Sequence, residues 1–302
     1  MAKILDGKVV RDQIQENLKS IIQNLKSKPK LVIIQVGDNP ESNTYIGQKI
    51  KFGERIGAKV DLQKLPADVS QDHLSSIIHN LNSTPTIHGI IIQMPISEHL
   101  NREKLIELID PKKDVDGLTN TNQKLLEENN PNAIIPATAK GVISILNFYK
   151  IKVSGKKATV VGRSKLVGAP VATLLKNLGA TVEIGHSKTP DLTAVTKPAD
   201  IIVVAVGKPN LISKEHVSKG QAIVDVGINV VERQQETSDK RQEGKENKRP
   251  MANGKRLLVG DVNFSEVQPI VSAITPVPGG IGPMTVASLF ENLLEAYKKQ
   301  DD

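Results

Sequence analysis

Three polar side chains in the first third of the chain have types and positions that could support proton transfer. Tyr45 and Lys49 are four residues apart on a helix predicted over residues 42–56, so they share one helix face. Gln93 lies near the end of a strand predicted over residues 89–94, at the carboxyl edge where α/β proteins gather their sites. Lysine and tyrosine can act as general acids or bases. A surface Tyr–Lys pair and a glutamine that caps a loop are also compatible with this spacing.

A short loop over residues 111–118, PKKDVDGL, adds two carboxylates. Asp114 or Asp116 could accept N–H bonds from a heterocycle, and Gly117 lets the backbone turn closely. An Asx-turn, in which the carboxylate bonds to its own backbone, fits the same residues. The six histidines are scattered and cysteine is absent, so the sequence predicts no metal site.

The segment ATVVGRSKLVGAPVATLLKNLGA, residues 158–180, indicates a dinucleotide site. A strand leads into Gly162, and a helix is expected to begin near Gly168 with Pro170 in its first turn. Free backbone N–H groups at such a helix start favour phosphate. The glycine spacing differs from the common G-x-G-x-x-G, so a tight turn of any α/β protein remains an alternative.

The end of the next predicted strand distinguishes between the two nicotinamide dinucleotides. NAD sites normally place Asp or Glu there to bind the ribose 2′-hydroxyl. Here the chain reads IGHSKT, with His186 and Ser187, and Arg163 and Ser164 lie in the facing turn. Cations and hydroxyls suit a 2′-phosphate, so NADP is predicted over NAD. Glu183, within the strand, is expected to point away by strand alternation.

Short apolar runs alternate with helical patterns almost throughout, which indicates parallel βαβ units. The first series has strands predicted at residues 31–36, 60–65 and 89–94 and helices at 42–56, 70–81 and 101–109. The second series has strands at 158–161, 181–184, 201–206 and 222–226, after a helix at 139–149, and a last helix is expected at 286–298. We therefore predict an α/β fold of two α/β lobes, the second Rossmann-like, with the active-site cleft between them.

Composition narrows the class of protein. Lys and Arg number 40 and Asp and Glu 33, so the net charge is 40 − 33 = +7, which fits a solvated Lys-rich surface or attraction for anionic ligands. Aromatic residues, at 2%, are too few for the stacking platforms of nucleic-acid-binding proteins. The absence of cysteine fits a reducing compartment. No leader peptide and no apolar run of about 20 residues are present, so we expect a cytoplasmic protein without membrane or nucleic-acid partners.

Residues 232–256 form a long polar segment with eight basic and five acidic residues. Such a composition cannot bury a core, so a mobile surface loop with no catalytic part is predicted.

Eight segments, in order along nearly the whole chain, resemble the bifunctional methylenetetrahydrofolate dehydrogenase/cyclohydrolase (FolD-type) family. They are VGDNPESNTYIGQKIKFGERIGA from Val36, GIIIQMPI, PKKDVDGL, VVGRSKLVGAPVATLL, the GHS turn, VDVGIN, GDVNF and PVPGGIGPMT. The resemblance implies hydride transfer from 5,10-methylenetetrahydrofolate to NADP⁺, followed by hydrolysis of the methenyl product to 10-formyltetrahydrofolate. It also implies a homodimer, and a place in one-carbon metabolism and purine biosynthesis.

By this resemblance Lys49 is the central cyclohydrolase residue, and Tyr45 and Gln93 position it and tune its protonation. Asp116 would hold the pterin ring, and Tyr45 would also touch the substrate. The implied NADP-binding residues are Gly162, Arg163, Ser164, Gly168, His186, Ser187 and Ile228, and Pro278, Gly279 and Gly280 would line the folate side. Residues 1–137 and 274–302 would form the folate-binding catalytic domain, and residues 138–273 the NADP-binding domain. The anionic glutamate tail of folate suits a basic chain.

The chain departs from the family pattern at a few positions. The usual Pro-Cys-Thr-Pro segment has Ala137 and Ala139 here, Ser97 replaces a proline, and Gly185 replaces a cysteine. Loss of a proline beside the cofactor cleft is expected to loosen the loop and to alter kinetics more than reaction class. Two rival functions are a monofunctional dehydrogenase without effective cyclohydrolase and a non-catalytic nucleotide- or nucleic-acid-binding protein that kept the fold.

Overall fold

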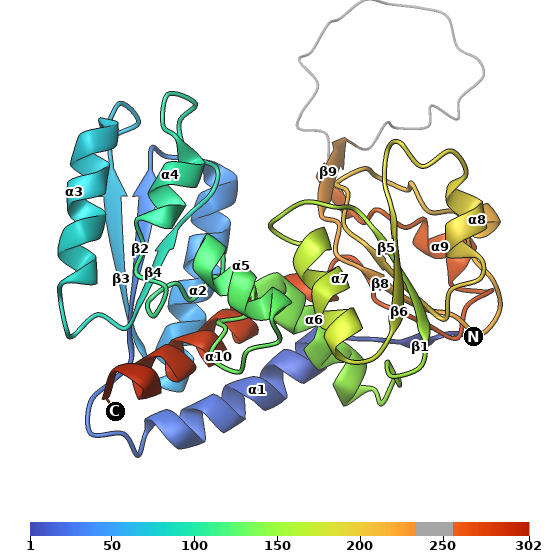
Figure 1. Ribbon diagram of the computed structural model, residues 1–302, viewed down its shortest axis with the longest axis horizontal. Coiled ribbons are helices and arrows are strands. Elements are labelled where there is room, and N and C mark those ends of the chain that lie inside the picture. Colours follow the sequence, from blue (N-terminus) through green and yellow to red (C-terminus); the bar gives the residue numbers. More distant parts are fainter. Residues whose placement is uncertain (233–255, 302) are drawn as a thin grey trace, which may run out of the picture.

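The chain folds into two α/β lobes that stand side by side on a layer of helices shared by both (Figure 1). A computed structural model describes residues 1–232 and 256–301. The first lobe is built around a three-stranded sheet and the second around a six-stranded sheet. The predicted α/β fold with two lobes is confirmed.

The first sheet is parallel, in the order β3–β2–β4. Its strands are β2 (Lys30–Val36), β3 (Lys59–Leu65) and β4 (Gly89–Ile92). Three helices pack on it: α2 (Pro40–Ile56), α3 (Gln71–Asn82) and α4 (Arg102–Glu107). β2 is almost wholly buried because α2 covers one face of the sheet and α3 and α4 the other. Ile33 therefore joins the core cluster on the α2 side, and its neighbour Ile34 joins the cluster on the α3 side.

The second sheet is also parallel, in the order β1–β11–β8–β7–β5–β6. Its strands are β1 (Lys3–Ile4), β5 (Lys157–Val161), β6 (Thr181–Gly185), β7 (Ile201–Val204), β8 (Ala222–Asp225) and β11 (Ala273–Ile274). The strands β6 and β7 lie on opposite sides of β5, so the strand order reverses beside β5. In open α/β sheets such a switch point opens a ligand crevice at the carboxyl ends of the strands.

Shorter elements complete the second lobe. They are α7 (Gly168–Asn177), α8 (Leu192–Thr196), the 3-10 helix η1 (Lys214–His216), α9 (Phe264–Val267) and a separate antiparallel ribbon of β9 (Asn229–Glu232) with β10 (Arg256–Val259). The predicted polar loop over residues 232–256 lies, between its two end residues, outside the described part of the chain.

Four helices lie between or beneath the lobes: α1 (Gly7–Ile22), α5 (Asn120–Glu127), α6 (Ala137–Phe148) and α10 (Ile281–Asp301). α10 packs against α1 and α6 and also contacts α2 and β4. A Cβ at Gly141 of α6 would lie 2.9 Å from the Met284 Cβ of α10, so this close approach requires glycine. α10 begins at Ile281 rather than at residue 286, because Pro283 is tolerated in a first helical turn.

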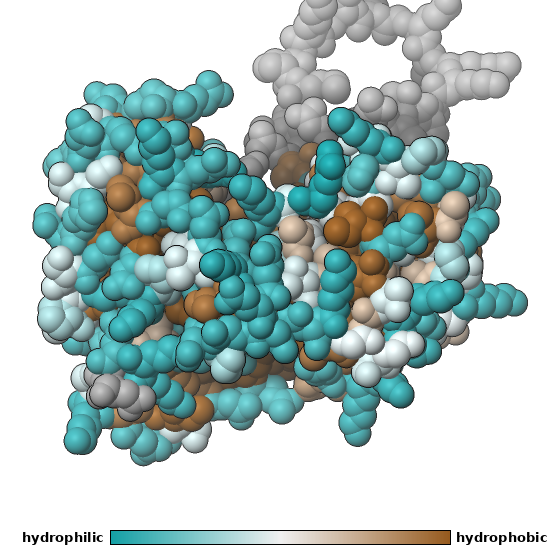
Figure 2. Space-filling model, viewed as in Figure 1, coloured by the Kyte–Doolittle hydropathy of each residue, from teal (hydrophilic) through white to brown (hydrophobic). Residues whose placement is uncertain are grey.

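The surface in Figure 2 is mostly polar, with apolar patches on both lobes. Within residues 1–232 and 256–301, no helix combines the length and the apolar character needed to cross a membrane.

Candidate active site

Lys49 on α2 is held by Gln93, which follows β4. The Lys49 Nζ donates to the Gln93 Oε1 over 2.8 Å, and the Gln93 Nε2 donates to the Met94 carbonyl over 2.8 Å. The second bond fixes the Gln93 amide so that its oxygen faces the lysine. The Gln93 main-chain N–H donates to the Ile34 carbonyl of β2, which holds the residue at the carboxyl edge of the sheet. The structure thus brings Lys49 and Gln93 together.

The two aspartates of the 111–118 loop have different surroundings. The buried Asp114 carboxylate accepts from the N–H groups of Leu118 and Thr119, over 3.1 and 2.8 Å, and from the Asn122 side chain over 2.9 Å. Asp114 therefore shapes the loop, although its carboxylate bonds the backbone four and five residues further along and not two residues on, as in an Asx-turn. Asp116 instead lines the same cavity as Lys49 and Gln93, and is the carboxyl group available to a ligand there.

Lys49 and Asp116 influence each other's protonation. Burial lowers the pKa of Lys49, and the nearby Asp116 carboxylate opposes part of that shift. Burial also raises the pKa of Asp116, while Lys49 opposes the rise and Asp114 adds to it. In both groups burial favours the uncharged form, because a charge is poorly solvated there. The opposite charges of the two groups offset part of this effect for each other.

Both lobes contribute to the cavity, whose volume is about 220 Å³. Leu166 and Val167, from the turn between β5 and α7, face the first-lobe residues across it. Thr138 of α6 and Thr285 of α10 also line it, and their hydroxyl oxygens lie 3.3 Å apart. These four residues were not among the predicted site residues. The available signal was their position within segments already recognised, PATA, GRSKLVG and GPMT.

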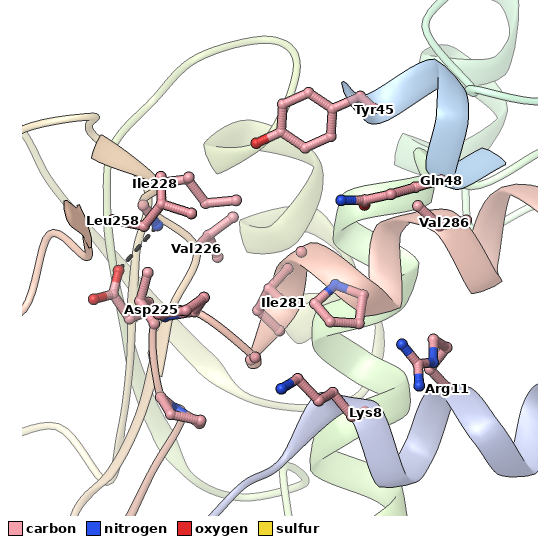
Figure 3. A pocket seen from close by; sticks show the side chains of 18 of the residues that line it. Lys8, Arg11, Tyr45, Gln48, Asp225, Val226, Ile228, Leu258, Ile281 and Val286 are labelled. Carbon is pink, nitrogen blue, oxygen red and sulfur yellow. Dashed lines mark hydrogen bonds between the residues drawn. The ribbon is translucent and has the colours of Figure 1, made fainter. Parts of the chain in front are cut away.

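Tyr45 lines a second cavity, of about 380 Å³, rather than the one around Lys49. Its ring projects from α2 opposite Ile228, with Val226 and Leu258 beside Ile228 (Figure 3). Residues four apart are separated by about 6 Å along a helix, which is enough to place them in neighbouring cavities. The helix face predicted for Tyr45 and Lys49 therefore serves two cavities.

The second cavity has a cationic side. Four of its lining residues are basic: Lys8 and Arg11 of α1, and Lys51 and Arg55 of α2. Figure 3 shows Lys8 and Arg11 below the cavity, on the side away from Tyr45. Among the lining residues that the structure describes, the only acid is Asp225. These cations were not predicted, although each pair has helical spacing, i,i+3 in α1 and i,i+4 in α2.

The predicted folate-side residues Pro278, Gly279 and Gly280 also line this second cavity. The Gly7 N–H at the start of α1 donates to the Gly279 carbonyl over 2.9 Å, and a Cβ at Gly7 would lie 1.8 Å from the Gly280 carbonyl oxygen. The glycine therefore allows α1, and with it Lys8, to approach the Pro-Gly-Gly segment closely.

The turn after β5 depends on two glycines. Gly162 has φ +126°, and a Cβ there would lie 2.3 Å from the Ala205 carbonyl oxygen. A Cβ at Gly168 would lie 2.3 Å from the Gly162 carbonyl oxygen. The Ser164 hydroxyl accepts from the N–H of Val167 at 3.3 Å and of Gly168 at 3.4 Å, which orients the start of α7. The turn is compact enough for its backbone to approach a phosphate.

The turns after β5 and β6 are neighbours because Val161 pairs with Gly185 in the sheet. Arg163 and Ser164 in the first turn and Ser187 in the second are exposed. The structure thus places together the side chains predicted to bind a 2′-phosphate.

His186 shapes the second of these turns. Its N–H donates to the Thr189 hydroxyl over 3.0 Å, and its Nδ1 accepts from the Lys188 N–H over 3.1 Å. In β6, Val182 and Ile184 pack against the core, so the intervening Glu183 lies on the other face. Across residues 1–232 and 256–301, no group of three or more His, Cys, Asp or Glu could hold a metal ion.

Two segments of the chain match one enzyme family. Residues 5–116 match the tetrahydrofolate dehydrogenase/cyclohydrolase catalytic domain, and residues 136–301 match the NAD(P)-binding domain of that family. The chain is 41% identical over 298 residues to the bifunctional protein FolD of Acholeplasma laidlawii, an alignment that covers 99% of each protein.

Solved structures give the same result. The bifunctional FolD methylenetetrahydrofolate dehydrogenase/cyclohydrolase of Campylobacter jejuni is 39% identical, with a TM-score of 0.88 over 99% of both chains. The Trypanosoma brucei methylenetetrahydrofolate dehydrogenase-cyclohydrolase (FolD), complexed with NADP and an inhibitor, is 34% identical, with a TM-score of 0.87 over 99% of this chain and 98% of that one.

Proposed function

Because the chain belongs to the tetrahydrofolate dehydrogenase/cyclohydrolase family, we propose that it oxidises 5,10-methylenetetrahydrofolate with NADP⁺ and hydrolyses the product to 10-formyltetrahydrofolate. One observation carries this proposal: Lys49, Gln93 and Asp116 meet in a cavity that also contacts the turn after β5. Side chains that can transfer protons to and from water therefore lie beside the turn after β5, whose backbone is suited to binding a dinucleotide.

In the hydrolytic step, Lys49 acts as the general base. A water oxygen bonds to the cationic methenyl carbon while one water proton passes to the neutral Lys49 amine. The hydroxyl proton then moves to N5 of the folate as the bond between that carbon and N5 breaks, which leaves a formyl group on N10. Lys49 suits this role because burial lowers its pKa. Gln93 keeps the amine in place, since its amide oxygen accepts the Lys49 hydrogen bond.

In the oxidative step, bound NADP⁺ accepts the hydride that leaves the methylene carbon. The protein's part is to hold the two reacting carbons in line, which is mainly positioning. Asp116 contributes by accepting N–H bonds from the pterin ring, and Tyr45 contacts the substrate from the neighbouring cavity.

The residues around the β5 turn fit NADP. The cradle formed by Gly162 and Gly168 has no room for side chains, so the backbone itself faces the ligand. Arg163, Ser164 and Ser187 are exposed at the ends of adjacent strands and can bind a 2′-phosphate, with His186 shaping the turn. Ile228, at the edge of the second cavity, would contact the nicotinamide end.

The cations of the second cavity suit the glutamate tail of folate. Lys8, Arg11, Lys51 and Arg55 line the same cavity as Tyr45 and the Pro278–Gly280 segment, so a substrate whose ring system reaches Asp116 would extend its tail among them. Each added γ-linked glutamate brings one more carboxylate. The proposed substrate therefore includes polyglutamylated forms.

The proposal extends to the organisation of the molecule. Residues 1–137 and 274–302 would form the folate-binding catalytic domain, and residues 138–273 the NADP-binding domain, except that β1 and β11 pair within the sheet of the second lobe. A homodimer is proposed from the resemblance to the family, and Leu257 on the β9–β10 ribbon offers an apolar side chain that is exposed in the single chain and lines neither cavity. The cytoplasm, without membrane or nucleic-acid partners, is the proposed location, and the 10-formyl product would serve purine biosynthesis.

One spectrophotometric assay tests the function. Purified protein with methylenetetrahydrofolate should reduce NADP⁺ faster than NAD⁺, and methenyltetrahydrofolate added directly should be hydrolysed faster than in buffer. Reduction without enzymatic hydrolysis would favour the monofunctional dehydrogenase. The absence of both activities would favour a non-catalytic nucleotide-binding protein.

A further inference from the structure

Two buried aspartates lie outside the groups assigned above. Asp225 ends β8 and is 3% exposed, and Asp261 follows β10 and is 0% exposed. Within the described chain neither forms an ion pair. A buried carboxyl group is unfavourable unless hydrogen-bond donors surround it, so its partners indicate its role.

Asp225 binds its own loop and that of Asp261. Its Oδ1 accepts from the N–H of Gly227 over 2.9 Å, drawn as the dashed line in Figure 3, and from the N–H of Asp261 over 3.1 Å. Its Oδ2 accepts from the N–H of Val262 over 2.9 Å. The segments after β8 and β10 are therefore tied together.

Asp261 extends these ties to a third loop. Its Oδ2 accepts from the N–H groups of Val206 and Gly207, over 2.7 and 2.9 Å, directly beyond β7. Its Oδ1 accepts from the Asn229 side chain over 2.9 Å. One carboxyl group thus holds main-chain and side-chain donors from two different loops.

The two aspartates interlock through glycines. A Cβ at Gly260 would lie 1.8 Å from the Asp225 Oδ2, and a Cβ at Gly227 would lie 2.2 Å from the Asp261 Cγ. The Asp225 carboxyl group therefore fills the space where a side chain at Gly260 would lie, and the Asp261 carboxyl group fills the space where a side chain at Gly227 would lie. The pairing depends on the sequences Asp-Val-Gly at 225–227 and Gly-Asp at 260–261.

The loops that Asp261 holds border the switch point of the second sheet. Val206 and Gly207 follow β7, which pairs with β5. The carbonyl group of the preceding residue, Ala205, lies close to Gly162 in the turn after β5, so that Gly162 has no room for a side chain. Val206 and Ile228 are 38% and 41% exposed despite being apolar, so they can offer contact surface to a ligand.

We propose that Asp261, interlocked with Asp225, is a positioning residue for the dehydrogenase step, because it fixes the two loops that border the nicotinamide cofactor. This inference rests on the proposed function. Asp261 itself is fully buried and touches no substrate. Its effect passes through the N–H groups of Val206 and Gly207 and through Asn229, and does not reach the Lys49 cavity.

A comparison of cofactor binding with the hydrolytic step distinguishes a positioning role of Asp261 from a general structural role. Hydrolysis of methenyltetrahydrofolate needs water and Lys49 but no cofactor. Asp261→Ala should raise the Kd for NADPH, and the KM for NADP⁺, about tenfold or more, because the three hydrogen bonds that its carboxyl group accepts are lost. Its rate of methenyltetrahydrofolate hydrolysis should stay within about twofold of the unmutated rate, since that cavity is unchanged. Asp261→Asn keeps an oxygen acceptor of the same size and should retain most of the cofactor affinity.

Two further variants complete the test. Gly227→Ala keeps the Asp261 carboxyl group but displaces it, so it should weaken NADPH binding in the same way. Asp200→Ala is the matched control: Asp200 accepts from the Lys157 N–H over 2.9 Å at the start of β5, at the opposite edge of the sheet, and its loss should leave NADPH binding unchanged.

An unchanged Kd in folded Asp261→Ala and Gly227→Ala would overturn the proposal, as would a parallel loss of hydrolysis and cofactor binding. If Asp261→Ala does not fold, Gly227→Ala decides, and unaltered NADPH binding in that folded variant would equally overturn it. An unmutated protein that lacks both activities would instead overturn the proposed function, which this design keeps separate.

Discussion

We expect Lys49 to be required for hydrolysis and much less for hydride transfer, because only hydrolysis needs a group that accepts a proton. Lys49→Gln keeps a polar chain but cannot titrate. We expect hydrolysis of methenyltetrahydrofolate to fall by about 10²–10⁴-fold, while methylenetetrahydrofolate is still oxidised, so that the methenyl product accumulates. Direct assay from methenyltetrahydrofolate, corrected for spontaneous hydrolysis, measures this step.

A matched control is Lys59→Gln, which removes an exposed lysine of β3 and should leave both steps unchanged. Hydrolysis by Lys49→Gln at the unmutated rate would refute the general-base role. Equal loss of both steps in a folded variant would make Lys49 a substrate-positioning residue instead.

The pH profile of hydrolysis reports the protonation of Lys49. Because burial lowers the pKa of Lys49, the enzymatic rate should rise with pH and level off below the range of an ordinary lysine. The Asp116 carboxylate opposes that lowering. Asp116→Asn should therefore move the inflection to lower pH, even if the maximal rate falls. The measurement is the rate from methenyltetrahydrofolate against pH, and an inflection that moves to higher pH would contradict the coupling.

Arg163 is expected to select NADP over NAD. Arg163→Ala should raise the KM for NADP⁺ by about ten- to a hundred-fold, because a charge-assisted contact is worth about 1.5–3 kcal/mol. The KM for NAD⁺ should change little, since NAD⁺ has no 2′-phosphate. Steady-state kinetics with both cofactors checks this, and equal changes for the two would show that Arg163 contacts a part they share.

Among the elements, α2 is expected to bind both the reacting end of the substrate and its tail. Lys51 and Arg55 line the second cavity, about two and three helical turns from Tyr45. Replacing both by Gln should raise the KM for a pentaglutamate substrate about three- to tenfold more than the KM for the monoglutamate, because exposed charge pairs are individually weak. The value of kcat should not change.

The tail-length comparison has its own control. Lys59→Gln with Lys176→Gln also removes two exposed charges, from β3 and α7, outside both cavities. This variant should keep the unmutated preference for long tails. If the two double variants respond alike, net charge rather than a local cationic wall is responsible.

Long strands could be predicted from the sequence, and very short ones could not. β2 could be predicted because it is a continuous run of apolar residues buried on both faces, and the predicted family and its cofactor class are confirmed by the comparisons. The strands β1 and β11 were missed. Each has two residues, and their pairing partners lie far away in the sequence, so no local pattern marks them.

The candidate site shows the same limit. Lys49, Gln93 and Asp116 were selected from motifs, and the structure places them around one cavity. Tyr45 lies in a second cavity, which four basic residues of α1 and α2 also line, and this arrangement depends on how the two helices meet across the fold. The spacing of residues along a helix predicts which side chains share a helix face, but it does not predict which other element packs against that face.

At the scale of the whole molecule, the contact between α6 and α10 is expected to hold the two lobes together. Gly141→Ala would bring a Cβ to 2.9 Å from the Met284 Cβ, so the helices must move apart. We expect the free energy of unfolding to fall by about 1–3 kcal/mol, as for other overpacked cores. Urea unfolding followed by circular dichroism measures it.

Gly47→Ala is the control for that substitution. A Cβ at Gly47, in α2, meets no atom within 4 Å, so alanine should leave stability unchanged or raise it by up to about 1 kcal/mol through its higher helix propensity. Equal destabilisation by both substitutions would show that the α6–α10 contact has no special role.

The pairing of β1 with β11 also sets an order of events during synthesis. The strands of the first sheet lie within residues 30–92 and can pair once that segment has emerged from the ribosome. Lys3–Ile4 are made before Ala273–Ile274 and must wait for them before this pairing can form. A nascent chain shorter than that exposes an open edge on β8. Translation therefore delivers the strands of the first sheet early, and residues 273–301 both supply β11 to the dinucleotide lobe and bring α10 to the core of the folate-side lobe.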